Sequence, residues 1–256
     1  MCFISAIGLL FVLCDAEEIY SIVAMTATSS TLPVRKVLAA ALLVFPCAFI
    51  LVFIMHFHHL ADFFHFHVHY VPRSPERVVA ALIAAHNRWP MIHDPHVFAY
   101  LMLPVFPLCA FALYLLGRGT RPLASAITLM ITISGSIYMG GLFGMWTAFY
   151  RGIGLVDPVN QAGAIATFTA LTTPQGAFLM TTWLAKLTML GLAVQMLTLV
   201  RSRVVPVWSI VCVVLGCSLF LAFWDLDNWM LIGTLFLLAG FIPVRKAVLQ
   251  GAEESA

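Results

Sequence analysis

The stretch that decides the fold is VLAAALLVFPCAFILVFIM, residues 37–55, which contains no charged side chain. A helix needs about 20 apolar residues to cross a hydrocarbon core of ~30 Å, and this run is of that order. Arg35 and Lys36 stand directly before it, as basic residues do where a membrane helix begins on the cytoplasmic side. The stretch therefore predicts a transmembrane helix.

Further apolar runs follow along the chain. Together they predict six spans at about 37–55, 97–116, 123–149, 177–200, 207–224 and 229–243, the last being the shortest. Pro104 and Pro107 should kink the second span. The chain is 62% hydrophobic and 9% charged, whereas a soluble domain is about 25% charged. We expect an all-α, polytopic membrane helix bundle in contact with the lipid bilayer.

The placement of the basic residues predicts the orientation of the bundle. With a cytoplasmic amino terminus, eight of the 13 Lys and Arg residues fall on the inner side, namely Arg35, Lys36, Arg118, Arg121, Arg201, Arg203, Arg245 and Lys246. Six transmembrane helices with both termini cytoplasmic satisfy the positive-inside rule throughout. We expect a multi-pass protein of a bacterial cytoplasmic membrane, with a cytoplasmic tail at 247–256.

Residues 1–36 form an N-terminal segment ahead of the six-span domain at 37–246. The apolar run from Phe3 to Leu13 is too short to span and lacks the basic start of a signal peptide. We expect translation to start at Met25, which would make 1–24 upstream sequence. The net charge of +2, without a cluster of Lys and Arg, argues against a nucleic-acid partner. Oligomeric partners are not indicated.

All nine histidines lie in the one long loop, at 56–96, which the expected topology places outside. If the first span continued as a helix, His58, Asp62 and His65 would share one face. Imidazole and carboxylate ligands suit Zn, Cu or Ni, and a tetrahedral Zn site needs three or four ligands. Besides this face, histidine alternates with apolar residues at 65–69, and His93 and His96 form a close pair. The candidate metal ligands are therefore His58, His59, Asp62, His65, His67, His69, His93 and His96.

Three interpretations of these histidines stay open. They are amphipathic side chains suited to a membrane interface, ligands for a divalent metal, or groups that respond to pH because histidine titrates near neutrality. The spacings of His56-Phe-His58-His59 and His93-Asp-Pro-His96 depart from the HxxxH and HxxHH boxes of membrane di-iron enzymes, which also lie on the other, cytoplasmic side. No P-loop, GxSxG, HExxH or CxxC motif occurs. We expect a non-enzymatic protein that binds a divalent transition metal on its outer face. A metal-dependent membrane enzyme is an alternative.

A small-solute or ion transporter is the other alternative. Lys186 is the one basic residue within an expected span, where a charge costs about 2.5–3.5 kcal/mol, and Gln195 lies in the same span. Asp225 or Asp227, in the turn before the last span, would be the acidic partner of Lys186. Snorkelling of Lys186 towards the headgroups is the simpler explanation.

Two further patterns concern packing. Ser136, Gly140 and Gly144 form a small-xxx-small face on the third span, which predicts close helix packing, with a lined pathway as the alternative. Ser74-Pro75-Glu76 predicts the start of a short amphipathic helix in the long loop, with an apolar stripe at Val78, Val79, Leu82 and Ile83. The segment 151–175 is expected to form a lid over the bundle.

Overall fold

A computed structural model describes residues 32–57, 59–67, 74–86, 95–172, 176–224 and 226–253, and every regular element in these ranges is a helix. Five helical segments are long and apolar enough to cross a membrane: Leu32–Ile54, Val97–Gly117, Pro122–Gly154, Leu179–Arg201 and Asp227–Gly251. The all-helical, multi-pass membrane fold is thereby confirmed. The remaining expected span is a shorter apolar helix, Val207–Ala222. Residues 1–24 and the expected start at Met25 lie outside the described residues.

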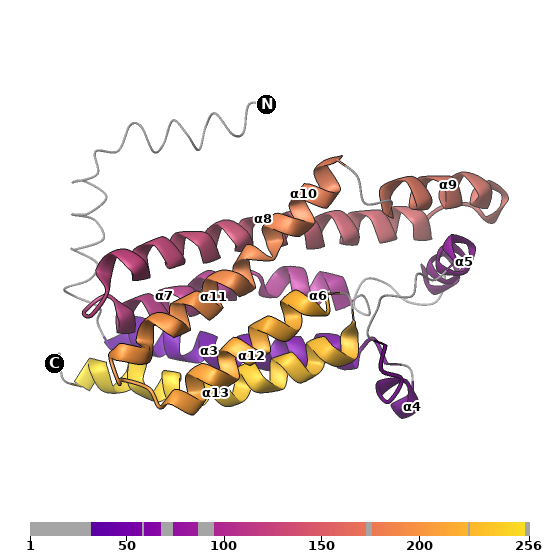
Figure 1. The fold of residues 1–256 in the computed structure, drawn as a ribbon. Helices are drawn as coiled ribbons and strands as arrows, with labels where there is room; N and C mark the ends of the chain where they lie inside the picture. The colour runs from indigo at the N-terminus through magenta and orange to yellow at the C-terminus, as the bar shows by residue number, and fades with distance from the viewer. Residues whose placement is uncertain are drawn as a thin grey trace, which may run out of the picture.

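The bundle is built from helices that run side by side along one axis (Figure 1). They are α3 (Leu32–Ile54), α7 (Val105–Gly117), α8 (Pro122–Gly154), α11 (Leu187–Thr198), α12 (Val207–Ala222) and α13 (Asp227–Glu253). Large aromatic side chains fill the space between them, among them Phe45 of α3, whose ring centroid lies 4.4 Å from that of Phe106 and 6.3 Å from that of Phe241. Apolar side chains also cover the outside, as at Leu123, Ile127 and Ile137 of α8. Such a surface suits lipid rather than water.

Two of the spans are interrupted. α6 (Pro95–Met102) and α7 are separated at Leu103 and Pro104, where proline cannot donate a backbone hydrogen bond. The second span is thus interrupted at Pro104, one of the two prolines that we expected to kink it. Pro107 lies in the first turn of α7, where that missing donor does not matter. α10 (Gly176–Ala185) and α11 are separated at Lys186, a break that the sequence did not predict.

Helix lengths differ from those expected. α13 has 27 residues and continues through Pro243 to Glu253, so the expectation that the last span is the shortest is wrong. Neighbouring helices allow a proline inside a membrane helix, as at Pro46 of α3. α8 has 33 residues, and at ~1.5 Å per residue its length of about 50 Å exceeds a hydrocarbon core of ~30 Å. The carboxy-terminal end of α8 projects beyond the ends of α12 and α13 (Figure 1).

Short helices pack around this projecting end of α8 (Figure 1). α5 (Pro75–His86) begins as predicted, with the Arg77 backbone N–H donating to Ser74 Oγ at 3.3 Å. Its stripe is buried at Val79 and Ile83, in one cluster with Ile153 of α8 and Phe168 of α9 (Gln161–Thr172). The expected lid at 151–175 thus contains a helix, α9, which follows a 3-10 turn at Pro158–Asn160.

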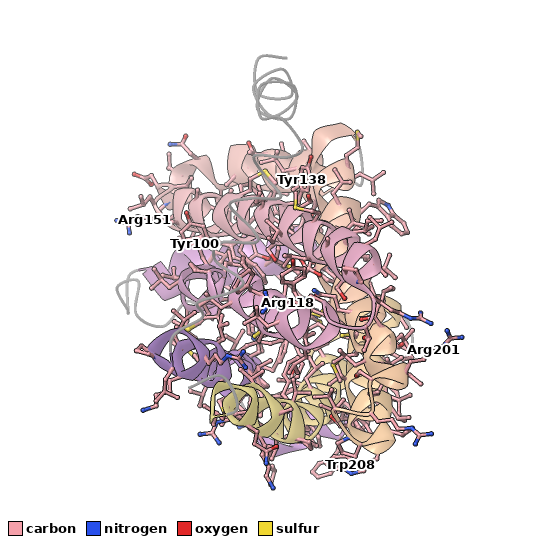
Figure 2. The ribbon with its side chains drawn as sticks, turned by 90° about the vertical axis from the view of Figure 1, so that its left-hand side faces the viewer. Tyr100, Arg118, Tyr138, Arg151, Arg201 and Trp208 are labelled. Carbon is pink, nitrogen blue, oxygen red and sulfur yellow. The ribbon has the colours of Figure 1, made fainter. Side chains whose placement is uncertain are left out.

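The two ends of the bundle carry different charges. The loops at 118–121 and 201–206 and the carboxy-terminal part of α13 lie at one end, which we call the basic end (Figure 1). There the Arg35 guanidinium donates to the carbonyl of Val248 at 3.4 Å and so joins the start of α3 to α13. Figure 2 faces this end, with Arg118 near its middle and Arg201 at its edge. We call the opposite end, where α4 (Leu60–Phe63) and α5 lie, the histidine end.

Candidate functional site

The histidine segment starts where α3 stops. α3 ends at Ile54, and the backbone N–H groups of His56 and Phe57 then donate to carbonyls three residues back, which tightens the chain into a turn. Nδ1 of His56 lies 2.8 Å from the carbonyl oxygen of Val52. α3 therefore does not continue as a helix beyond Ile54, which was the condition for placing His58, Asp62 and His65 on one helical face.

Asp62 has a structural partner in the short helix that follows, α4 (Leu60–Phe63). The His59 backbone N–H donates to Asp62 Oδ2 at 2.9 Å, which satisfies a donor that the helix start leaves open. The carboxylate of Asp62 is half-buried, whereas the side chain of His59 is exposed. Asp62 thus helps to hold the backbone beneath His59.

The phenylalanines that alternate with the histidines anchor the segment to the start of α13. Phe63 lies edge-on to Phe66, with ring centroids 5.7 Å apart, and Phe66 lies edge-on to Trp229 at 5.4 Å. Trp229 in turn stacks on Phe223 at 4.6 Å. We call Phe57, Phe63, Phe66, Phe223 and Trp229 the aromatic anchor.

Two polar side chains of α13 fix the backbone of the same segment. The side-chain amide of Asn228 donates to the carbonyl oxygens of Asp62 and Phe63, and the Trp229 indole N–H donates to that of His67 at 2.9 Å. Neither Asn228 nor Trp229 was identified as a site residue from the sequence. Nothing in a single sequence indicates that residues more than 160 positions apart are hydrogen-bonded.

Of the described imidazoles, His56 is half-buried beside Val52 and the other three are at the surface. The side chains of His59, His65 and His67 are all exposed. Among the described residues, no three His, Cys, Asp or Glu side chains come together as a group that could hold a metal ion. The remaining candidates lie outside what the structure describes: His58, His69 and His93 entirely, and His96 in its side chain.

Lys186 lies at the break between α10 and α11, and its described side-chain contacts are aromatic. Its Nζ lies 4.7 Å from the ring centroid of Trp183 and 5.6 Å from that of Trp224, near enough for cation–π attraction to both. Trp183 is 63% exposed on the outside of the bundle. Of the expected acidic partners, Asp225 lies outside the described residues and Asp227 is half-buried at the start of α13.

Gln195 lies on the opposite side of α11, inside the bundle. Lys186 and Gln195 are nine positions apart, which is two and a half helical turns at about 100° per residue. Their side chains therefore point in opposite directions. Gln195 is 1% exposed, and its Nε2 donates to the carbonyl of Ala110 at 3.0 Å while its Oε1 accepts from Thr132 Oγ1 at 3.3 Å. The structure therefore does not bring Lys186 and Gln195 together on one surface.

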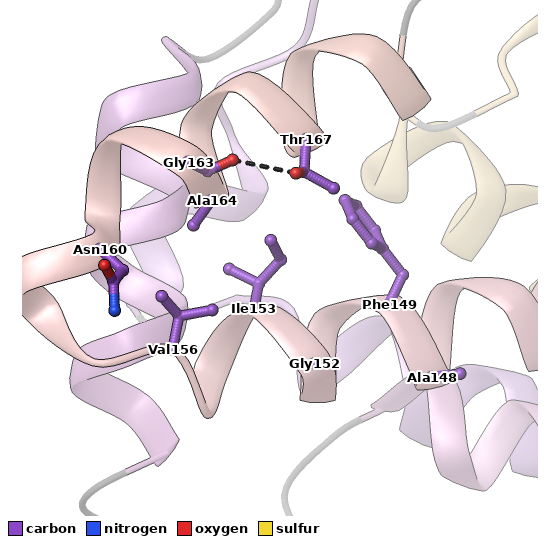
Figure 3. A pocket seen from close by; sticks show the side chains of 9 residues that line it. All are labelled: Ala148, Phe149, Gly152, Ile153, Val156, Asn160, Gly163, Ala164 and Thr167. Atoms are coloured by element: carbon purple, nitrogen blue, oxygen red, sulfur yellow. Dashed lines mark hydrogen bonds between the residues drawn. The ribbon is translucent and has the colours of Figure 1, made fainter.

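An apolar groove lies between the projecting end of α8 and α9 (Figure 3). Its volume is about 530 Å³, and Phe149, Ile153 and Val156 point into it from α8 and the turn that follows. Thr167, on the α9 side, donates its hydroxyl to the carbonyl of Gly163 at 2.9 Å. The lining contains no titratable side chain, so the groove offers shape without reactive groups.

No family model, no curated protein and no solved structure matches this chain. The integral membrane character follows from the apolar helices, and any finer assignment depends on the residues described above.

Proposed function

We propose that this membrane protein binds a divalent transition-metal ion, Zn, Cu or Ni, through the histidine segment at its histidine end. The observation that carries the proposal is the exposure of three imidazoles, His59, His65 and His67, on a backbone that α13 holds in place. Anchoring the backbone lowers the entropy lost when the side chains converge on an ion. Imidazole is a good ligand for these metals.

The sequence of phenylalanine and histidine residues in this segment supports the proposal. In 57–67 Phe66 lies edge-on to Trp229 of α13 and Phe63 lies edge-on to Phe66, while the side chains of His59, His65 and His67 are exposed. A purely structural set of histidines would show bonds such as the one that His56 makes to Val52. His58, His69, His93 and His96 would supply further ligands to complete a coordination shell of three or four.

The test is the metal content of the purified protein by elemental analysis, after loading with Zn, Cu or Ni and removal of unbound ion. We expect about one ion per chain, and its loss when His58, His59, His65, His67 and His69 are all changed to Ala. The matched control is His56→Ala, which removes an imidazole that already has a backbone partner and should keep the metal. Metal-free protein after loading, or equal loss in the control, contradicts the proposal.

We also propose six membrane crossings, with the basic end in the cytoplasm. α11 ends at the basic end and α13 begins at the histidine end, so α12 has to pass between them although it has only 16 residues (Figure 1). Eight of the 13 basic residues then face the cytoplasm, which agrees with the positive-inside rule.

Cysteine accessibility in sealed right-side-out vesicles tests this topology. Val159→Cys, in the 3-10 turn at the histidine end, should react with a membrane-impermeant maleimide, whereas Ser202→Cys should react only after permeabilisation. Leu226→Cys, at the other end of α12 from Ser202, should behave like Val159→Cys. The unmodified chain measures the reactivity of the native cysteines. Equal labelling at 202 and 226 would show that α12 does not cross.

The transporter alternative has less support. Its candidate residues are divided between the outside of the bundle, where Lys186 lies beside Trp183, and the interior, where Gln195 is hydrogen-bonded to Ala110 and Thr132. The Ser136 hydroxyl donates to a carbonyl of its own helix, as packing hydroxyls do. The single hydroxyl hydrogen of Thr132 is shared between the Thr128 carbonyl of its own helix and Gln195. Neutralising Lys186 should therefore leave metal binding unchanged.

A further inference from the structure

Lys186 carries an ammonium group with three donors into the membrane-spanning part of the bundle. It lies 10 residues after the start of α10 at Gly176, or about 15 Å along the helix from the histidine end. Its described contacts are the faces of two indoles, which attract the charge but offer no lone pair to the three N–H donors. In an apolar surrounding such donors need an acceptor.

The surroundings of Lys186 indicate where the acceptor comes from. Trp183 is on the lipid-facing side of α10, and Trp224 follows α12 where that helix ends at the histidine end. Tryptophan prefers the level of the headgroups, and a lysine stem extends towards that level while its methylenes stay in the hydrocarbon. The ammonium is thus held by two indoles on the face of the bundle where lipid phosphates lie.

We propose that Lys186, with Trp183 and Trp224, forms a binding site for the phosphate group of an anionic membrane lipid in the leaflet at the histidine end. The ammonium would donate to the phosphate oxygens, and the indoles would hold the lysine stem in the direction of the headgroup. A charge-assisted hydrogen bond of this kind is stronger than one between neutral groups. This inference concerns a different surface from the histidine segment and does not depend on metal binding.

The experiment is native mass spectrometry of the full chain after equilibration with equal amounts of phosphatidylglycerol and phosphatidylcholine in detergent. We expect the wild-type chain to retain the anionic lipid with a preference on the order of fivefold, the factor that one lysine contributes at an anionic surface. Lys186→Met should reduce this preference and Lys186→Arg should keep it. Lys246→Met, which removes one charge at the basic end, is the matched control and should retain the lipid that Lys186 binds.

Three results would overturn the proposal. The first is unchanged retention in Lys186→Met. The second is displacement of the lipid by millimolar inorganic phosphate, which would assign the site to a soluble anion. The third is a gain of anionic lipid in Asp225→Asn that Lys186→Met abolishes, because the ammonium would then be paired with that carboxylate in the native protein.

Discussion

Two helix interfaces in this bundle are both built on glycine but differ in what surrounds the glycines. Between α8 and α11, Gly135 and Gly191 meet the backbone of the facing helix, and buried Thr132, Thr188 and Gln195 lie beside them. Between α12 and α13, Gly216 and Gly240 make a similar approach in apolar surroundings, where Ser209 supplies a cross-helix hydrogen bond. Lipid gives no hydrophobic drive for helix association, so close packing has to supply it in both places.

The difference teaches how polar groups are used inside this membrane protein. Most hydroxyls of the α8–α11 interface donate within their own helix, as Thr128 does to Ala124 at 2.8 Å, and so tie nothing together. Gln195 is different, because it bonds both α7 and α8. The stability of the polar α8–α11 interface should therefore depend most on its glycines and next on Gln195. The stability of the apolar α12–α13 interface should depend almost entirely on its glycines.

The largest effect should follow from Gly135→Ala. A Cβ at this position would overlap the backbone nitrogen of Thr188 and lie 2.6 Å from the carbonyl carbon of Leu187, and backbone atoms cannot turn aside. We expect the free energy of unfolding, measured by steric trapping in bicelles, to fall by about 3 kcal/mol. Gly152→Ala, in the same helix with nothing within 4 Å of its Cβ, is the control and should not destabilise. Equal effects of the two would show that α8 and α11 are less closely packed.

Gly240→Ala tests the apolar interface in the same way. Its Cβ would lie 2.8 Å from the carbonyl oxygen of Ser209 and 2.6 Å from Cγ2 of Val213, a side chain that can shift. We expect a loss of about 2 kcal/mol by the same measurement, smaller than for Gly135→Ala. A larger loss here would reverse the ranking of the two interfaces.

Gln195→Leu removes the polar cross-link while keeping the volume of the side chain. Hydrogen bonds between membrane helices contribute about 0.6 kcal/mol on average and up to about 1.7, and Gln195 makes two of them. We expect a loss of about 1.5 kcal/mol. A double-mutant cycle with Thr132→Val isolates the part shared with α8, and a coupling energy of zero would show that the Thr132 bond contributes nothing.

Sequence patterns were sufficient to predict local features of this molecule and insufficient to predict contacts between distant residues. Local chemistry predicted the membrane helices, the break at Pro104 and the Ser74 cap of α5, because each depends on residues a few positions apart. The contacts of Gly135 with Thr188 and of Trp229 with His67 join distant residues. Gly140 and Gly144, of the expected small-xxx-small face, lie near Leu103 and Tyr100. The closest contact of α8 is instead at Gly135, which meets the backbone of α11.

The candidate site likewise combines features that depend on nearby residues with contacts between distant ones. The clustering of histidine was visible in the sequence, and the expected end of the first span at residue 55 lies one residue from the end of α3. The geometry of the histidine segment also depends on its contacts with Asn228 and Trp229 of α13, which join residues far apart in the sequence. α9 was not predicted because its apolar and small residues follow no helical stripe. For Lys186 the sequence indicated a carboxylate partner and not the two indoles, because Trp183 in α10 and Trp224 after α12 come from different parts of the chain.

The smallest effect should come from Ser209→Ala. Ser209 Oγ donates to the Gly240 carbonyl at 2.6 Å and is completely buried, so it is the apolar interface's counterpart of Gln195 with one bond in place of two. We expect a loss of about 0.6 kcal/mol, the average for such a bond between membrane helices. Thr128→Val is the matched control, because its hydroxyl bonds only its own helix and its removal should change stability by less. If Ser209→Ala costs as much as Gln195→Leu, the second interface also depends on a polar cross-link, and the contrast between the two interfaces would reduce to the tightness of their glycine contacts.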